Sequence, residues 1–156
     1  MKLAENMKIV PVLALDTIGS GGDFNSINME GFHHCTFIIT FGTLVGDGVL
    51  TINSGATDGA KTSALTFNYS LAGAAIGSAG CDVIVADTAA ATLTLTAATY
   101  TDFMLLVEVD ASDMDVANGE MWLTGSLSNA GTSGAMDVVA ILEPRYTGNL
   151  SATALT

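Results

Sequence analysis

The sequence predicts an all-β fold, a jelly-roll-like or Greek-key β-sandwich of about eight or nine strands with extended terminal arms. Three observations lead to this prediction. Apolar and polar residues alternate over several short runs, which is the pattern of half-buried strands. Clusters of Gly, Asn, Asp and Ser separate these runs and are typical of turns. Helix signals are weak, because glycines interrupt the Ala-rich stretch 71–79, which we interpret as a loop.

In the first half of the chain, we expect strands at residues 9–15, 35–41, 49–54 and 64–71. The strand at 35–41 has the clearest alternation. Its apolar face carries Cys35, Phe37, Ile39 and Phe41, and its other face carries Thr36, Ile38 and Thr40.

In the second half, we expect strands at residues 82–86, 103–110, 121–128 and 137–143. The Ala-, Thr- and Leu-rich segment 89–101 also favours a strand, because apolar and polar residues alternate over 92–96. Two of these strands contain segments that are apolar on both faces. Such a strand must be buried twice, by its own core and by a central position in a sheet or a contact with another subunit. The outward residues of these segments are therefore candidate interface residues: Met104, Leu106, Val139 and Ile141.

Three further interface candidates lie outside these segments. Trp122 falls on the side of its strand opposite the apolar face, where its ring either anchors an interface or is covered by a loop of the same chain. Arg145 and Tyr146 follow Pro144, which we expect to end the last strand. Arg145 is the only arginine, and we expect it to pair with a carboxylate of its own chain or of a neighbour.

The chain is long enough for one domain, and its composition indicates that this domain has partners. Apolar residues make up 49% of the chain and charged residues only 13%, against a usual share of about 25%. So few charges cover the surface of an isolated monomer poorly, so we expect an oligomer. The net charge of −12 argues against nucleic acid as a partner, because binding phosphates requires clustered Lys and Arg.

We divide the chain into an N-terminal arm with the first strand (1–16), a β-sandwich domain (17–146) and a C-terminal tail (147–156). The two ends lack a core pattern, so we expect them to depend on a neighbour for order. The apolar run 9–15 is too short for an export signal or a membrane span. We therefore expect a protein made in the cytoplasm, without a membrane partner.

The run His33-His34-Cys35 is the one cluster of classical metal ligands or of a nucleophile with a base. In a regular strand His33 and Cys35 share a face and His34 points to the other, so a zinc site needs further ligands from elsewhere. We expect structural roles for these residues, and we expect neither a cofactor nor a metal. Cys35 and Cys81 are expected to be reduced apolar residues, although a disulfide between them stays open.

The acidic stretch 110–120 does not have the spacing of an EF-hand. It is either a solvated loop or a loose Ca²⁺ site. The common signatures of phosphate loops, serine hydrolases, zinc proteases and redox dithiols do not occur. The sequence therefore predicts no catalytic residue and no enzyme activity.

Five segments resemble small structural proteins of tailed-bacteriophage heads, over roughly residue 9 to the end of the chain. They are Gly-Phe-His-His-Cys-Thr-Phe at 31–37, Gly-Asp-Gly-Val-Leu-Thr at 46–51, Leu-Thr-Phe-Asn-Tyr at 65–69, Leu-Leu-Val-Glu-Val-Asp-Ala at 105–111 and Ala-Ile-Leu-Glu-Pro-Arg-Tyr at 140–146. The resemblance implies a decoration or cement protein: a β-sandwich or jelly roll on the capsid exterior that joins adjacent major capsid proteins. It also implies a homo-oligomer, with a trimer favoured and a dimer as the other choice, and no catalytic residue.

A second function also fits an acidic β-sandwich, that of a carbohydrate- or receptor-binding module of a phage tail or fibre. Such modules usually display a cluster of exposed aromatic side chains or a loop ordered by Ca²⁺. Here the aromatic candidates Tyr69, Tyr100, Trp122 and Tyr146 are scattered along the chain. We therefore treat this function as the alternative. A third class, a metal-dependent cupin-like enzyme, would need more histidines than the two present.

Overall fold

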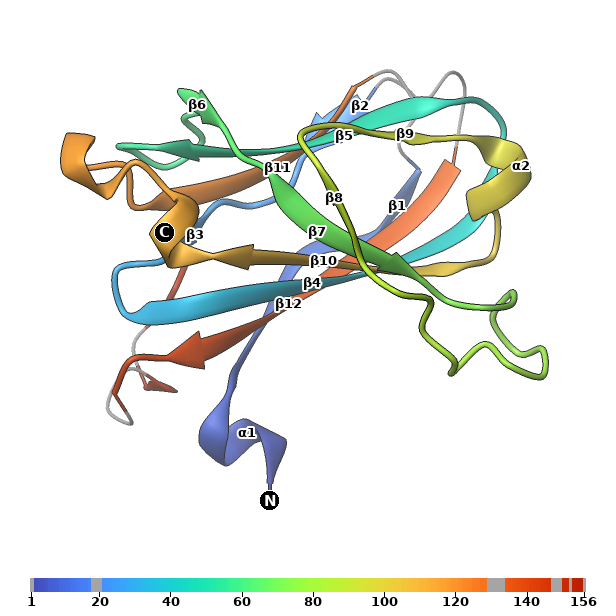
Figure 1. Cartoon of the computed structure of the whole chain (residues 1–156), viewed down its shortest axis with the longest axis horizontal. Helices are drawn as coiled ribbons and strands as arrows, with labels where there is room; N and C mark the ends of the chain where they lie inside the picture. Colours follow the sequence, from blue (N-terminus) through green and yellow to red (C-terminus); the bar gives the residue numbers. More distant parts are fainter. Residues whose placement is uncertain (1, 18–20, 129–133, 147–149, 152, 156) are drawn as a thin grey trace.

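The computed structural model describes residues 2–17, 21–128, 134–146, 150–151 and 153–155, and it confirms the predicted all-β sandwich (Figure 1). The first sheet, sheet A, has six antiparallel strands in the order β1 (Lys8–Thr17), β12 (Gly134–Pro144), β4 (Phe32–Leu44), β10 (Met104–Asp110), β7 (Phe67–Leu71) and β8 (Thr88–Ala90). Sheet B contains β2 (Gly21–Asp23), β11 (Trp122–Ser128), β5 (Gly48–Gly55) and β6 (Ser63–Ala64), with β3 (Ile27–Asn28) paired to β11 and β9 (Leu93–Leu95) paired to β5.

The described strands number twelve, more than the eight or nine expected. The additional strands are short: β2, β3, β6 and β8 have three residues or fewer. Their alternation is too brief to stand out in the sequence. Four short helical segments complete the fold, namely α1 (Leu3–Asn6), α2 (Ala97–Tyr100), η1 (Ala111–Asp113) and η2 (Val116–Asn118).

The core lies between the sheets and follows the alternation predicted for β4. Phe37 and Ile39 are almost fully buried, while Thr36 and Ile38 point outward and are only partly covered. Ile39 stands opposite Leu105 of β10 and Val138 of β12, which are fully buried as well. Buried residues of sheet B close the core from the other side: Leu50, Ile52, Leu123 and Leu127.

Two expected strands take a different form. Residues 82–86 make only one isolated bridge, between Ile84 and Ala72. After β9 the chain turns into α2, where the carboxylate of Asp47 accepts a hydrogen bond from the first helical N–H, that of Ala97. This turn buries the ring of Tyr100 against Phe41 at a centroid distance of 5.9 Å, so packing overrides the strand pattern.

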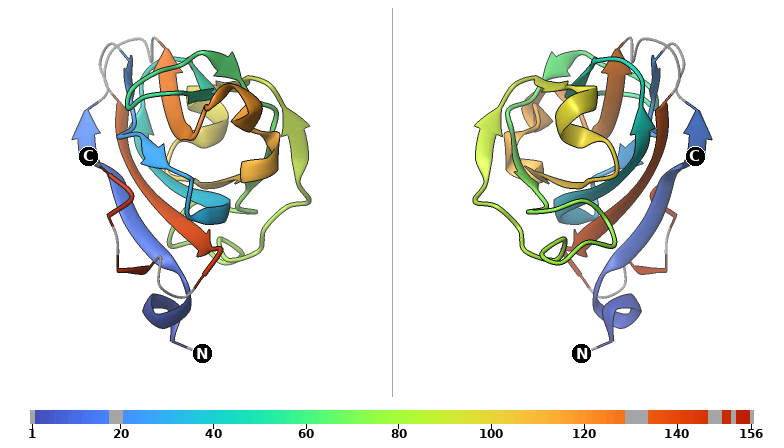
Figure 2. Two further views of the ribbon diagram at one scale, coloured as in Figure 1. Left: turned by 90° about the vertical axis from the view of Figure 1, so that its left-hand side faces the viewer. Right: turned by 90° about the vertical axis from the view of Figure 1, so that its right-hand side faces the viewer.

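The two ends of the chain behave differently. Helix α1 is exposed and projects beyond the sandwich, as Figure 2 shows, whereas β1 is a full member of sheet A through its pairing with β12. In the tail, residues 147–149, 152 and 156 lie outside the described part. The described tail residues contact their own domain: Ala154 is buried and its carbonyl accepts a hydrogen bond from the N–H of Asn28. The tail thus has contacts within its own chain, and its dependence on a neighbour stays a prediction.

No helix in the described ranges is long and apolar enough to cross a membrane.

Candidate functional site

The two strands with segments that are apolar on both faces, β10 and β12, lie on either side of β4 in sheet A. Because side chains alternate along a strand, Val138 and Ala140 are buried in the core while Val139 and Ile141 point outward. The core thus buries one face of each of these strands, and the outward face stays partly exposed in the single chain.

The strand register brings the outward side chains of four strands together. Ile38 of β4 lies opposite Val139 on one side and opposite Leu106 on the other. Val139 in turn lies opposite Pro11, and Ile141 lies opposite Ile9, whose residue is 43% exposed. Opposed positions in a sheet have Cβ atoms about 5 Å apart, so these side chains form a continuous surface. We call this surface the apolar face; it consists of Ile9, Pro11, Ile38, Met104, Leu106, Val139 and Ile141.

One end of the apolar face is acidic. His34 lies opposite Asp110 on β10 and Glu143 on β12. Its Nδ1 is 3.0 Å from Oδ1 of Asp110, and its Nε2 is 3.8 Å from Oε1 of Glu108. At the other end, Thr40 of β4 lies between Asp137 of β12 and Met104 of β10.

Among the described residues, no Lys or Arg side chain pairs with these carboxylates. The chain has only four Lys and Arg residues, and each of them has another partner. Lys2 pairs with Glu5, Lys61 pairs with Asp23, and the ammonium of Lys8 donates to the carbonyl of Leu150. The fourth is Arg145, described below. The apolar face therefore suits a partner with an apolar centre and a basic rim.

Arg145 and Tyr146 lie beyond the end of sheet A. Pro144 ends β12, as predicted. The backbone N–H of Arg145 donates to the carbonyl of Gly31, and its Nε donates to the carbonyl of Phe32 at 2.9 Å. Within the described residues Arg145 has no carboxylate partner, and its own chain supplies a carbonyl oxygen. Pairing with a carboxylate of a neighbouring subunit stays a prediction.

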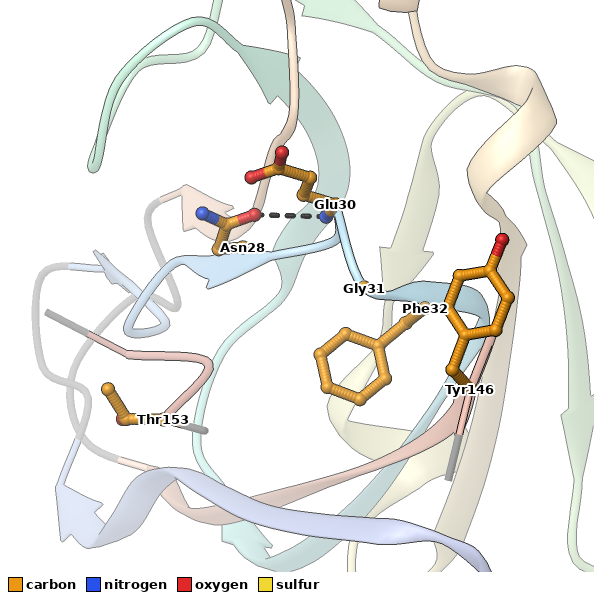
Figure 3. A pocket seen from close by; sticks show the side chains of 6 residues that line it. All are labelled: Asn28, Glu30, Gly31, Phe32, Tyr146 and Thr153. Atoms are coloured by element: carbon orange, nitrogen blue, oxygen red, sulfur yellow. Dashed lines mark hydrogen bonds between the residues drawn. The ribbon is translucent and has the colours of Figure 1, made fainter. Parts of the chain in front are cut away.

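Tyr146 stands at the edge of an open pocket of about 340 Å³ (Figure 3). Its residue is 75% exposed, the largest exposure among the large apolar and aromatic residues of the described part. The side-chain oxygen of Asn28 accepts a hydrogen bond from the N–H of Glu30 at 2.9 Å, which fixes the loop at the opposite wall. The pocket thus combines an exposed aromatic ring with a few polar groups, which makes it a candidate ligand site.

Trp122 does not join either of these surfaces. It lies on the outer side of sheet B, opposite Gly55 on β5 and Asn28 on β3, and it is partly buried. Its neighbour Thr124, which sequence alternation places on the same side, is fully buried beneath the loop that contains Ala60. The seven sequence-predicted interface residues therefore separate into three places, and only Met104, Leu106, Val139 and Ile141 form one surface.

The expectation that His33 and Cys35 share a face is wrong. The pairing of β4 with β12 shifts register between Glu143 and Pro144, so that His33 falls in the irregularity and is exposed. Proline cannot donate to the ladder, which accounts for the irregularity at this point. Cys35 is fully buried in the core, and burial raises the pKa of its thiol well above the usual range.

The remaining candidate ligands do not converge. Cys35 and Cys81 are both free thiols. Among the described residues, no three His, Cys, Asp or Glu side chains are arranged to hold a metal ion. In the acidic stretch, Asp115 precedes η2, and its carboxylate accepts hydrogen bonds from the backbone N–H and the side-chain amide of Asn118.

Glu120 has a role that the sequence did not indicate. Its carboxylate is buried and accepts hydrogen bonds from the hydroxyls of Ser54 at 2.6 Å and Ser63 at 3.2 Å. It thus joins the end of the acidic loop to β5 and β6. The stretch 110–120 is therefore not one solvated cluster, because its last carboxylate is part of the interior.

Sequence reasoning also missed part of the apolar face. Ile38 stands between Thr36 and Thr40 on the more polar side of its strand, and this single apolar residue was the available signal. Ile9 and Pro11 join the face only because β1 pairs with β12. A pairing between the first and last strands is not visible in either segment alone.

No protein-family model matches the chain, and no curated protein sequence is significantly similar to it. Among solved structures, the SPBc2 prophage-derived protein YomS is similar, with a TM-score of 0.54 and 12% sequence identity. The similarity covers 88% of this chain and 92% of that chain. The two proteins therefore share a fold over nearly their whole lengths.

Proposed function

We propose that this chain is a structural protein of a bacteriophage particle that binds the outer surface of the capsid and ties adjacent major capsid protein subunits together. The observation that carries the proposal is the apolar face: apolar side chains from four neighbouring strands, with carboxylates at both ends and no Lys or Arg. A contiguous apolar surface of this kind is typical of a protein-binding site.

The energetics favour such a contact. Each Å² of apolar surface removed from water contributes about 25 cal/mol, before the entropy cost of association is subtracted. A stable interface buries about 800 Å² on each partner. The apolar face supplies the centre of such an interface, and its acidic ends favour a partner surface that carries Lys or Arg.

The phage origin is supported by the fold shared with a prophage-derived protein. The capsid as the binding surface, the virion exterior as the location after synthesis in the host cytoplasm, and the major capsid protein as the partner are our proposal. Self-association, as a trimer or otherwise a dimer, belongs to the same proposal. We assign the chain no catalytic activity and no nucleic-acid or membrane partner.

A binding experiment with matched variants tests the proposal. Capsids of the encoding phage, assembled without this chain, are mixed with the purified protein and sedimented. Ile38→Thr together with Val139→Thr removes apolar surface while keeping β-branched side chains. Val45→Thr is the control, because Val45 is 60% exposed in the turn after β4 and lies away from the apolar face.

We expect the wild type and the control to sediment with capsids and the double variant to bind at least tenfold more weakly, which corresponds to about 1.4 kcal/mol. Absence of wild-type binding refutes the capsid assignment. Equal binding by the double variant refutes the assignment of the apolar face.

The alternative function, glycan or receptor binding, is favoured by one observation, the exposed Tyr146 at the open pocket. A glycan array probed with the wild type and with Tyr146→Ala tests it, with and without EDTA to reveal a Ca²⁺-dependent loop. Binding that is lost in Tyr146→Ala supports this alternative, and an array without signal contradicts it.

A further inference from the structure

The edges of the two sheets differ in how well they are protected against another strand. An edge strand exposes unpaired N–H and C=O groups, and proteins usually protect such edges with proline, bulges or very short strands. Strand β1 carries Pro11 and two register shifts. In sheet B the outermost strands have only two or three residues. The edge of sheet A beside the end of β7 is also short, but it carries exposed apolar side chains and no proline.

At that edge, residues 83–85 run antiparallel to the end of β7. The N–H of Gly73 donates to the carbonyl of Val83 at 2.7 Å, and the N–H of Val85 donates to the carbonyl of Leu71 at 3.0 Å. These two hydrogen bonds flank Ile84, so its own N–H and C=O point away from β7. Within the described residues they have no hydrogen-bond partner. The backbone is thus ready to pair with a further strand.

The side chains at this edge are apolar and exposed. Val83, Ile84 and Val85 are 60%, 40% and 54% exposed, respectively. The segment belongs to the loop that extends from the sandwich beyond β7 and β10 in Figure 1. Alternation places Ile84 on one side of the strand and its two neighbours on the other, so an added strand would gain apolar contacts on both sides.

The charges beside this edge indicate which strand would pair with it. Asp82 and Asp87 flank the apolar residues, and the whole chain carries a net charge of −12. Two copies paired edge to edge about Ile84 would bring the carboxylates of both copies close together, which is unfavourable. A strand with Lys or Arg at its ends would instead face opposite charge.

We propose that residues 82–87 form a strand-addition site for an extended segment of another protein that carries β-branched residues between basic ends. Affinity comes from the backbone of Ile84 and from apolar contacts, and preference among partners comes from Asp82 and Asp87. This site is separate from the apolar face and does not depend on capsid binding.

The test uses the full chain and a fluorescent peptide, Lys-Lys-Thr-Val-Thr-Val-Thr-Val-Lys-Lys. Two control peptides are a version with Glu in place of Lys and a version N-methylated at alternate residues, which cannot complete the ladder. The main protein variant is Ile84→Pro. It removes the outward N–H without removing a hydrogen bond of the chain, and circular dichroism checks its fold.

We expect saturable binding of the Lys peptide to the wild type and at least tenfold weaker binding to Ile84→Pro. The Glu and N-methylated peptides should bind at least tenfold more weakly to the wild type. If Ile84→Pro is unstable, the N-methylated peptide tests backbone pairing from the partner side. In the double variant with Asp82→Asn and Asp87→Asn, the affinities for the Lys and Glu peptides should differ less than in the wild type.

Three results overturn the proposal. The first is the absence of wild-type binding up to about 1 mM of Lys peptide. The second is equal binding of all three peptides. The third is a concentration-dependent dimer that Ile84→Pro abolishes, because a second copy would then occupy the edge.

Discussion

Ile38 and Ile39 are neighbours on β4, and the sandwich predicts that truncating them destabilises the fold to different extents. Ile39 is fully buried between Leu105 and Val138. Replacing it with Ala removes buried methyl groups and leaves a cavity, which costs about 2–5 kcal/mol in the free energy of unfolding. Ile38→Ala deletes the same atoms from the apolar face, where the isolated chain only partly covers them. We expect a cost of about 1 kcal/mol.

Urea unfolding of both variants at two protein concentrations measures these costs. Both substitutions lose the same β-branched side chain, so the difference between them reports burial rather than strand propensity. If Ile38→Ala costs as much as Ile39→Ala in a monomer, the chain itself covers the outer side of sheet A and our reasoning fails. If the cost of Ile38→Ala grows with protein concentration, another copy covers the apolar face.

Three further predictions concern the interior and one surface ion pair. A Cβ added at Gly125 would overlap the ring of Phe24, so Gly125→Ala should cost about 1–3 kcal/mol, and an unchanged melting temperature would contradict this packing. Glu120→Ala leaves the buried hydroxyl of Ser54 and the partly buried hydroxyl of Ser63 without their acceptor and should cost about 1–3 kcal/mol in urea unfolding, whereas a neutral effect would show that the carboxylate is dispensable. Burial opposes ionisation of Asp23, but hydrogen bonds from Lys61 and a serine outweigh it and lower the pKa of this carboxyl below its usual 3.8. The ionised carboxyl therefore stabilises the fold fully above its usual pKa. This stabilisation is lost as the pH falls through the lower pKa of the folded state. Unfolding of Asp23→Asn and wild type from neutral to strongly acidic pH should therefore show a small difference that vanishes at low pH, and a constant difference would argue against the ionised pair.

The alternation in β4 sufficed to predict a half-buried strand with Phe37 and Ile39 inward, because a period of two is a local property of the chain. The doubly apolar segments likewise indicated an outward surface. The way in which that surface is assembled was not predictable, because it depends on which strands are neighbours. The position of Ile38 between Val139 and Leu106 follows from strand order, which depends on contacts remote in sequence.

Local irregularities account for the errors. His33 leaves the regular face because of the register shift near Pro144, and one strand alone does not reveal where its partner slips. Tyr100 draws its segment into a helical turn by packing on Phe41, which is a tertiary effect. Glu120 looked like the end of an acidic loop, and only the fold brings it to the hydroxyls of Ser54 and Ser63.

The strand order of sheet A also has a consequence for synthesis on the ribosome. Strand β4 acquires its two neighbours only from β10 and β12, and β1 pairs only with β12, the last strand of the chain. A nascent polypeptide therefore cannot complete this sheet until residue 144 has left the exit tunnel. Strand β10 emerges earlier and covers one edge of β4, but the other edge stays open until β12 follows, which favours association with chaperones. Refolding of the released chain should be slow, on the timescale of milliseconds to seconds that is typical of such non-local β topologies.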